Sequence, residues 1–342
     1  MIYRTRAKRG LCSRGLFPLV IMIFFFCRCQ PRSEGEPITY QKKNQVSTLS
    51  DSSFVSDVRC IYFFQGLFLV SDYNRGQVIG LDNDLNVVKT YGNAGRGPGE
   101  IMGALGVYAS GESVYCVNQG AQAVEVFSYR SGIHQYSLRL PTEILGTTLN
   151  NRIFERDGLF FFSAPASQSL VAGFDHDSHV RLKFGSLVPF ETVFETMIRN
   201  SSFLFQAAGG KTLTISDNIP EIRLFDTYGN QELKLDISFV EPIKQRLYFS
   251  SKAQKRANSF HNLFEDVYYH DGLLYLLAIS GNDKPVCNEV VILSLDETGA
   301  KIHSVVKLDG AWYSALAVDN SRNMLIYNAS ADQLEYYVFN PN

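Results

Sequence analysis

The feature that most constrains the fold of this chain is a strand–turn–strand pattern that occurs six times. In each copy, two short runs rich in apolar, β-branched and aromatic residues flank a turn that contains Gly or Asn. Such pairs are typical of β-hairpins, because Gly and Asn tolerate the positive φ angles of tight turns. The turns lie at residues 66, 111, 158, 210, 272 and 322, so successive copies are 45, 47, 52, 62 and 50 residues apart.

Two further apolar runs follow the hairpin in the first five copies, as residues 77–82 and 87–91 do after the first. Units of four strands at this period are typical of propeller blades. We therefore predict an all-β fold over residues 38–342, a six-bladed β-propeller of four-stranded antiparallel blades. The 25 Phe and 18 Tyr of the chain suit half-buried strands and supply packing between blades.

The sixth copy has only three runs before the chain ends at Asn342. A strand-length segment without a partner, residues 38–41 or 46–49, stands before the first copy. We expect this N-terminal strand to complete the last blade, because an open ring would leave exposed sheet edges that favour aggregation.

The first 29 residues have the pattern of an export signal. Residues 1–15 carry five Lys or Arg and no acid, and an apolar run follows over residues 16–26. Cys27 and Cys29 come next, and residues 30–37 form a polar tether. The arrangement resembles a bacterial lipoprotein signal, which implies lipidation of one of these two cysteines. The expected location is the cell envelope, at the outer membrane or its periplasmic face; an uncleaved anchor and a plain secretory signal are the alternatives.

Two segments resemble known propellers. Residues 69–82 are similar to the repeat of NHL-type propellers, and residues 91–100 resemble the loop of TolB-like six-bladed propeller lipoproteins of Bacteroidetes. The resemblance covers residues 55–130 best. It implies an exported propeller and says little about chemistry.

The segment with Gly92, Gly95, Gly97 and Gly99 admits two interpretations. Its backbone N–H groups could bind an anion, but it lacks the GK[ST] ending of a phosphate loop and leads back into a strand. We favour a connector between blades, with Arg96 on a ligand-facing rim. Residues 175–179, Asp-His-Asp-Ser-His, could likewise bind a divalent cation, but they stand where the third blade needs a hairpin turn. We favour the turn and assign no metal site.

Polar residues at the starts of the inner strands are the best candidates for a central site. Asp57, Arg59, Arg152 and Asp266 are predicted to enter the channel, together with Asn151, Ser202 and Glu265. A carboxylate–amide set of this kind could hold Ca²⁺ or polarise a substrate. The simpler interpretation is that these groups satisfy backbone atoms and one another.

These patterns favour a binding module over an enzyme. The histidines form no triad-like set, no catalytic residue is assigned and no cofactor is expected. The formal net charge of −2 argues against a nucleic-acid partner. We predict a membrane-tethered module that binds a protein partner in the envelope or a carbohydrate-like ligand (a glycan), on the face of the blade-connecting loops. The alternative is a metal-dependent hydrolase or lyase with its site at the central channel.

The long fourth interval contains an insertion, residues 238–263. Apolar and basic residues alternate in it at helical spacing, and Pro242 is tolerated at a helix start. An amphipathic helix is expected there, and a second one within residues 187–200.

Overall fold

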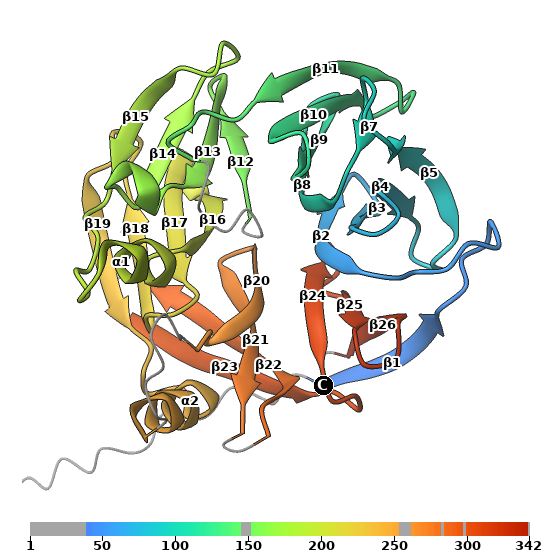
Figure 1. Cartoon of the computed structure of the whole chain (residues 1–342). Coiled ribbons are helices and arrows are strands. Elements are labelled where there is room, and N and C mark those ends of the chain that lie inside the picture. Colours follow the sequence, from blue (N-terminus) through green and yellow to red (C-terminus); the bar gives the residue numbers. More distant parts are fainter. Residues whose placement is uncertain (1–38, 145–151, 253–260, 282–283, 297–298, 341–342) are drawn as a thin grey trace, which may run out of the picture. The chain divides into compact units, whose positions relative to one another are not determined.

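Six four-stranded antiparallel sheets form a ring in the computed structural model, which describes residues 39–144, 152–252, 261–281, 284–296 and 299–340 (Figure 1). The fold is a six-bladed β-propeller, as the period of the turns predicts. The inner strand of each blade is the first strand of its hairpin. The last blade takes its outer strand, β1, from the N-terminal side of the propeller.

The blades follow one another along the chain. Blades 1 and 2 consist of β2 (Val58–Phe64), β3 (Leu67–Asp72), β4 (Gln77–Leu81) and β5 (Val87–Tyr91), then β8 (Ala104–Ser110), β9 (Ser113–Asn118), β10 (Ala123–Ser128) and β11 (His134–Arg139). Blades 3 and 4 consist of β12 (Phe154–Arg156), β13 (Leu159–Ser163), β14 (Val171–Phe174) and β15 (Val180–Phe184), then β16 (Ser202–Ala207), β17 (Lys211–Ser216), β18 (Glu221–Phe225) and β19 (Gln231–Asp236). Blades 5 and 6 consist of β20 (Phe264–His270), β21 (Leu273–Ser280), β22 (Val286–Asp296) and β23 (Gly299–Lys307), then β24 (Tyr313–Val318), β25 (Met324–Asn328), β26 (Gln333–Asn340) and β1 (Thr39–Val46).

Strand β1 closes the ring, which confirms the predicted N-terminal closure. It pairs antiparallel with β26, from Thr39 opposite Asn340 to Val46 opposite Leu334. This one strand includes residues 39–41 of the first candidate segment and Val46 of the second. Residues 1–38, with Cys27, Cys29 and the tether, lie outside the described residues.

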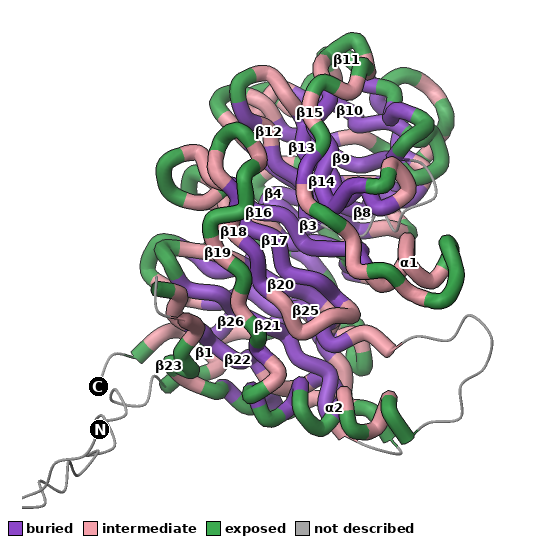
Figure 2. Tube along the Cα trace, turned by 90° about the vertical axis from the view of Figure 1, so that its left-hand side faces the viewer, coloured by how far each residue is buried: buried purple, intermediate pink, exposed green. Residues whose placement is uncertain are grey.

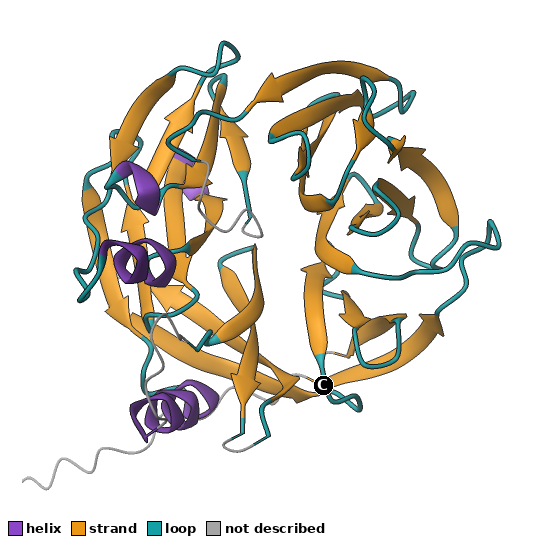
Figure 3. Cartoon of the chain, viewed as in Figure 1, coloured by secondary structure: helices purple, strands orange, loops and turns teal. Residues whose placement is uncertain are grey.

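The strand order defines two faces of the ring. The inner strands begin on one face, which also carries the connections between blades; we call it the connection face. The hairpin turns after the inner strands lie on the opposite face, which we call the turn face. The two longer helices, α1 (Val193–Arg199) and α2 (Glu241–Lys252), belong to blade connections, as expected for the two insertions (Figure 3).

The helices have simple sequence causes. The Thr192 hydroxyl caps α1 by accepting a hydrogen bond from the Glu195 backbone N–H at 3.0 Å. Pro242 occupies the first turn of α2, where its missing N–H costs no hydrogen bond. Within the described part of the chain, no helix has the length and apolar character needed to cross a membrane.

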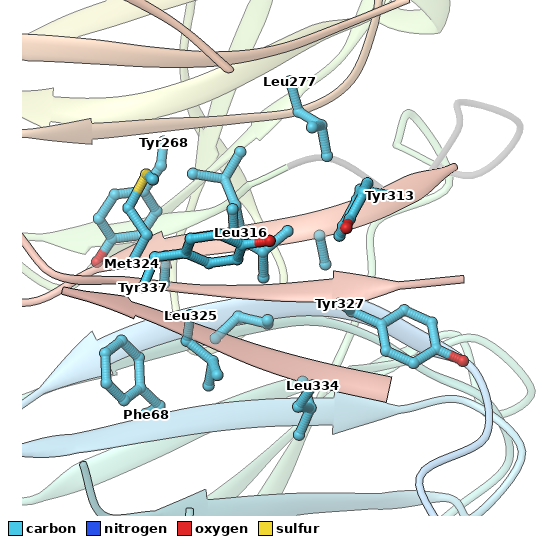
Figure 4. Close-up of a cluster of buried hydrophobic side chains, with 14 of the residues drawn as sticks. Phe68, Tyr268, Leu277, Tyr313, Leu316, Met324, Leu325, Tyr327, Leu334 and Tyr337 are labelled. Carbon is cyan, nitrogen blue, oxygen red and sulfur yellow. The ribbon is translucent and has the colours of Figure 1, made fainter. Parts of the chain in front are cut away.

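The core lies between the blades rather than at one centre. Figure 2 shows buried residues along the strands and exposed residues mainly in loops and helices. The largest buried cluster joins blades 5, 6 and 1 and includes Tyr268, Leu316 and Phe68 (Figure 4). Aromatic pairs cross blade interfaces, as the Phe and Tyr content predicts. They include Phe68 with Tyr336, Tyr115 with Phe160, Phe184 with Phe225, and Phe205 with Tyr269.

Candidate functional site

The centre of the ring is occupied by Arg152, whose side chain is 3% exposed. Its guanidinium donates to backbone carbonyls of three other blades, namely those of Ile61, Val267 at 2.8 Å and Leu316 at 2.6 Å. It also pairs with the Asp266 carboxylate. Arg152 precedes β12, so one side chain links blade 3 with blades 1, 5 and 6.

The Asp266 carboxylate is fully engaged by this arrangement. It accepts from Arg152 Nε at 3.1 Å, from the Val267 N–H at 2.8 Å and from the Leu316 N–H at 2.9 Å. A second Arg152 nitrogen donates to its other oxygen. A carboxylate offers about four lone-pair positions, so Asp266 keeps none for a cation or a substrate.

On the turn-face side of Arg152 the channel widens into a pocket of about 410 Å³, which we call the channel pocket. It lies opposite to the blade-connecting loops, the face on which the ligand is predicted from the sequence. The ring centroids of Tyr62 lie 5.2 Å from Tyr108 and 6.3 Å from Tyr268. The Arg152 guanidinium, also part of the lining, stacks over Tyr268 at 4.9 Å from the ring centroid. Further polar residues of the lining are Gln206, His270 and Asn320.

Burial keeps the phenols of this pocket neutral. It raises the pKa of Tyr268 to about 12, and that of Tyr62 moves in the same direction. Burial also lowers the pKa of His270. The pocket therefore presents aromatic faces, hydroxyls and amides around the positive charge of Arg152.

The other predicted site residues lie apart from the channel pocket. Asp57 and Arg59 form a 2.8 Å ion pair near the start of β2, and Arg59 stacks over the Tyr73 ring at 5.2 Å. Arg96 lies in the Gly-rich segment, where its Nε approaches Met102 Sδ at 3.2 Å. The structure thus brings four of the five candidates together in two separate pairs, and only the pair of Arg152 and Asp266 lies at the channel, where it joins blades. Asn151 of the predicted set lies outside the described residues.

The Gly-rich segment is a connector between blades 1 and 2. The short strands β6 (Asn93–Ala94) and β7 (Glu100–Ile101) pair with each other within it. The Gly97 N–H donates to the Glu100 carboxylate at 2.7 Å. A Cβ on Gly95 would lie 2.1 Å from the same carboxylate. The Gly-rich segment therefore folds around the carboxylate of its own Glu100.

The segment 175–179 is the hairpin turn that blade 3 requires. Asp175 Oδ1 accepts from the N–H groups of Asp177 at 3.0 Å and His179 at 2.9 Å, and Arg181 Nε binds its Oδ2 at 2.6 Å. The ligand-type atoms of Asp175, Asp177 and His179 do lie within 4.8 Å of one another. The same hydrogen-bonded turn occurs at Asp82, Asp226 and Asp319. The cluster follows from a recurrent turn.

One group of polar side chains resembles a catalytic triad but lacks its geometry. Glu125 Oε2 accepts from Ser137 Oγ at 2.5 Å and lies 3.0 Å from His134 Nε2. That same Nε2 is 3.3 Å from Ser137 Oγ. In a triad the imidazole uses its two nitrogens to join the acid to the nucleophile, so this set cannot relay a proton in that way. Glu125 also accepts from Asn118, a brace that Glu335 and Asn328 repeat in blade 6.

Two acids on the connection face were only half anticipated. Glu265 belongs to the predicted inner-strand set, whereas Asp217 follows β17 in a segment that looks like an ordinary loop. Burial, with a contribution from the charge of Glu265, raises the pKa of Asp217 to about 8. Burial and the neighbouring Asp266 raise the pKa of Glu265 to about 7. Only the contact between blades 4 and 5 brings them together, and neither local sequence shows that contact.

Comparison with known proteins supports the fold. No family model matches the chain, and no curated protein matches it. A solved structure of a DUF4221 family member from Bacteroides vulgatus is similar, with a TM-score of 0.56, 9% identity, and coverage of 89% of this chain and 98% of that one. A Bacteroides fragilis protein predicted to be exported is similar with a TM-score of 0.54 and 11% identity, over 89% of this chain and 95% of that one. Virginiamycin B lyase from Staphylococcus aureus is similar with a TM-score of 0.52 and 10% identity, over 88% of this chain and 99% of that one.

Proposed function

We propose that the protein is an exported, membrane-tethered binding module that holds a carbohydrate-like ligand in the channel pocket. The observation that carries this proposal is the pocket itself, with about 410 Å³ lined by four tyrosines, the polar residues Gln206, His270 and Asn320, and Arg152. Ligand pockets of proteins typically have roughly 300–1,000 Å³, mostly apolar walls and a few polar groups that orient the ligand.

The chemistry of the lining suits a sugar ring. The C–H face of a pyranose packs on the face of an aromatic side chain, as at the rings of Tyr62 and Tyr108. Its hydroxyls need both donors and acceptors, and the Gln206 and Asn320 amides supply both. The charge of Arg152 also suits a sugar that carries a carboxylate.

The engagement of Asp266 favours binding over reaction. A metal-dependent hydrolase or lyase at the channel centre needs a carboxylate that is free to hold the ion or move a proton. Asp266 spends its oxygens on Arg152 and on the N–H groups of Val267 and Leu316. The lyase of similar fold shares 10% of its sequence with this chain, so its activity lends no support to the enzyme alternative.

The first described residue of the chain, Thr39, lies on the same face of the ring as the channel pocket. Strand β1 is an outer strand that runs from the turn face to the connection face, so Thr39 lies at the turn face. Nine residues, 30–38, separate Cys29 from β1. Fully extended they reach about 30 Å, so a lipid on Cys29 would tether the propeller to the membrane through a linker of at most about that length.

Titration of the purified chain with a panel of neutral and acidic oligosaccharides tests the ligand class. We expect binding by at least one of them, and we expect Tyr62→Ala to weaken it at least tenfold because the stacking face is lost. Tyr228→Ala is the matched control, because Tyr228 lies in an outer turn of blade 4 and is 82% exposed. Absence of saccharide binding, with capture of an envelope protein that Tyr62→Ala abolishes, would contradict the carbohydrate proposal and favour a protein partner.

A further inference from the structure

The connection face contains a second group of polar side chains that the proposed function does not use. Of the inner-strand set, Arg152 and Asp266 are paired with each other, and Asp57 is paired with Arg59. We propose that Glu265, with Asp217 and Asn218, forms a site for a divalent cation of the Ca²⁺ class where blade 4 meets blade 5.

The backbone holds Asp217 firmly between the two blades. Its N–H donates to the Ser201 carbonyl at 3.2 Å, at the entry to blade 4. Its own carbonyl accepts from the Leu263 N–H at 2.6 Å, at the entry to blade 5. Leu263 is two residues before Glu265, so the same contact brings the second carboxylate to this position.

Two side-chain oxygens at this position have no hydrogen-bond partner among the described residues. Asp217 is 7% exposed, and its Oδ1 is buried without a hydrogen bond in the described part of the chain. Oδ1 of the adjacent Asn218 is buried and unpartnered in the same way. A buried polar atom without a partner is destabilising, so two on consecutive residues point to a ligand that satisfies both.

Arg59 and Arg246 lie near enough to lower the pKa of Glu265, but burial has the larger effect, and both guanidinium groups bind other partners. Arg59 is paired with Asp57 at 2.8 Å, and Arg246 Nε donates to the Asn262 carbonyl at 3.1 Å. Two carboxylates and one amide carbonyl remain, a set made only of oxygen. Oxygen-only sets of this kind suit hard cations such as Ca²⁺, whereas a transition metal would favour nitrogen or sulfur. Backbone carbonyls and water would complete the coordination.

A cation at this position would join the loop after β17 to the start of β20, and hence blade 4 to blade 5. Its role is to fasten the ring, so the inference is independent of the ligand in the channel pocket.

Calorimetric titration of the full chain with CaCl₂, after treatment with EDTA, tests the site. We expect one Ca²⁺ per chain and a rise in Tm with saturating Ca²⁺. Asp217→Asn should weaken binding at least tenfold and abolish the rise in Tm, and Glu265→Gln should weaken binding too. Asp177→Asn is the matched control, because Asp177 belongs to the exposed turn of blade 3; it should bind Ca²⁺ like the wild type.

A folding control keeps the test decisive. In EDTA, Asp217→Asn should unfold at a Tm at least equal to that of the wild type, because it removes an uncompensated buried carboxyl. The proposal is wrong if the wild type binds no divalent cation, or if Asp217→Asn binds Ca²⁺ as the wild type does. It is also wrong if Asp177→Asn alone abolishes binding. A Tm of Asp217→Asn in EDTA below the wild-type value would show that Asp217 has a partner within the protein, and would overturn the proposal as well.

Discussion

At the residue scale, Arg152 shows how a polar side chain can hold a ring of sheets together. The blades share few covalent connections near the axis, and the inner strands expose backbone carbonyls to the channel. A guanidinium carries five N–H donors in one plane, and here they bind carbonyls or the carboxylate of three other blades. The charge needed for this role is compensated by Asp266.

Removing that charge should be costly. We expect Arg152→Ala to lower the free energy of unfolding by about 3–5 kcal/mol, because it leaves Asp266 buried and unpaired. Urea denaturation measures the effect. Arg59→Ala, which breaks a partly exposed pair, should cost less than about 1 kcal/mol. Equal losses in the two variants would contradict a structural role for the central pair.

The acids of the connection face make a pH prediction for the chain in EDTA. Ordinary unfolded carboxyl groups titrate near pH 4, whereas Asp217 titrates at about 8 and Glu265 at about 7 in the folded chain. The folded state therefore binds more protons over this window, and stability falls as the pH rises from about 4 to about 8. Thermal unfolding at several pH values should show this fall. Asp217→Asn should flatten it, and an unchanged slope would contradict the assignment.

At the element scale, a recurrent turn explains much of the regularity of the blades. Asp82, Asp175, Asp226 and Asp319 each accept from the N–H groups two and four residues later. The residue three positions after each Asp has a positive φ, for example 66° at Leu85 and 87° at Gly229. In each turn the Asp carboxylate accepts hydrogen bonds from backbone N–H groups and so stabilises the turn.

Asp319 is the buried member of this group, and it also accepts from Tyr336 Oη at 3.1 Å. We expect Asp319→Ala to cost roughly 1–3 kcal/mol, because it leaves buried donors unsatisfied. The comparison variant is Asp226→Ala. The turn of Asp226 is exposed, so water can replace the hydrogen bonds that the substitution removes. Chemical denaturation should show a larger loss of unfolding free energy for Asp319→Ala than for Asp226→Ala. The reverse order would contradict the role of burial.

The strands were predictable from the sequence because their signals are local. Alternation and turn residues mark β2 and β3 within a few positions of each other, and the missing strand of the sixth copy indicated β1. The central residues were only partly predictable. Arg152 and Asp266 were selected as polar residues of inner strands, but 114 positions separate them and their pairing depends on the closed ring. Asp217 has no local signal, because Glu265, whose charge acts on it, belongs to the next blade.

At the scale of the whole molecule, closure of the ring by β1 makes the N-terminal segment part of the fold. Truncation of residues 1–46 should expose the edge of β26 and cause aggregation, which size-exclusion chromatography detects. Truncation of residues 1–37 keeps β1 and should leave a monodisperse protein. Monodisperse behaviour of both truncations would contradict the importance of closure.

The tether is tested separately. Under the lipoprotein hypothesis, mass spectrometry of the mature protein should find an acylated N-terminal cysteine at position 27 or 29. An unlipidated N-terminus, or one that begins before Cys27, would contradict that hypothesis and leave the propeller as an exported or anchored protein without lipid.

The central claim is that ligands bind in the channel pocket on the turn face. Hydrogen–deuterium exchange with and without the saccharide that binds in the titration locates the site directly. We expect protection in peptides that cover the ends of β2, β16 and β20, near Tyr62, Gln206 and His270. Protection confined to α1, α2 or the outer strands, with those three ends unchanged, would contradict the account.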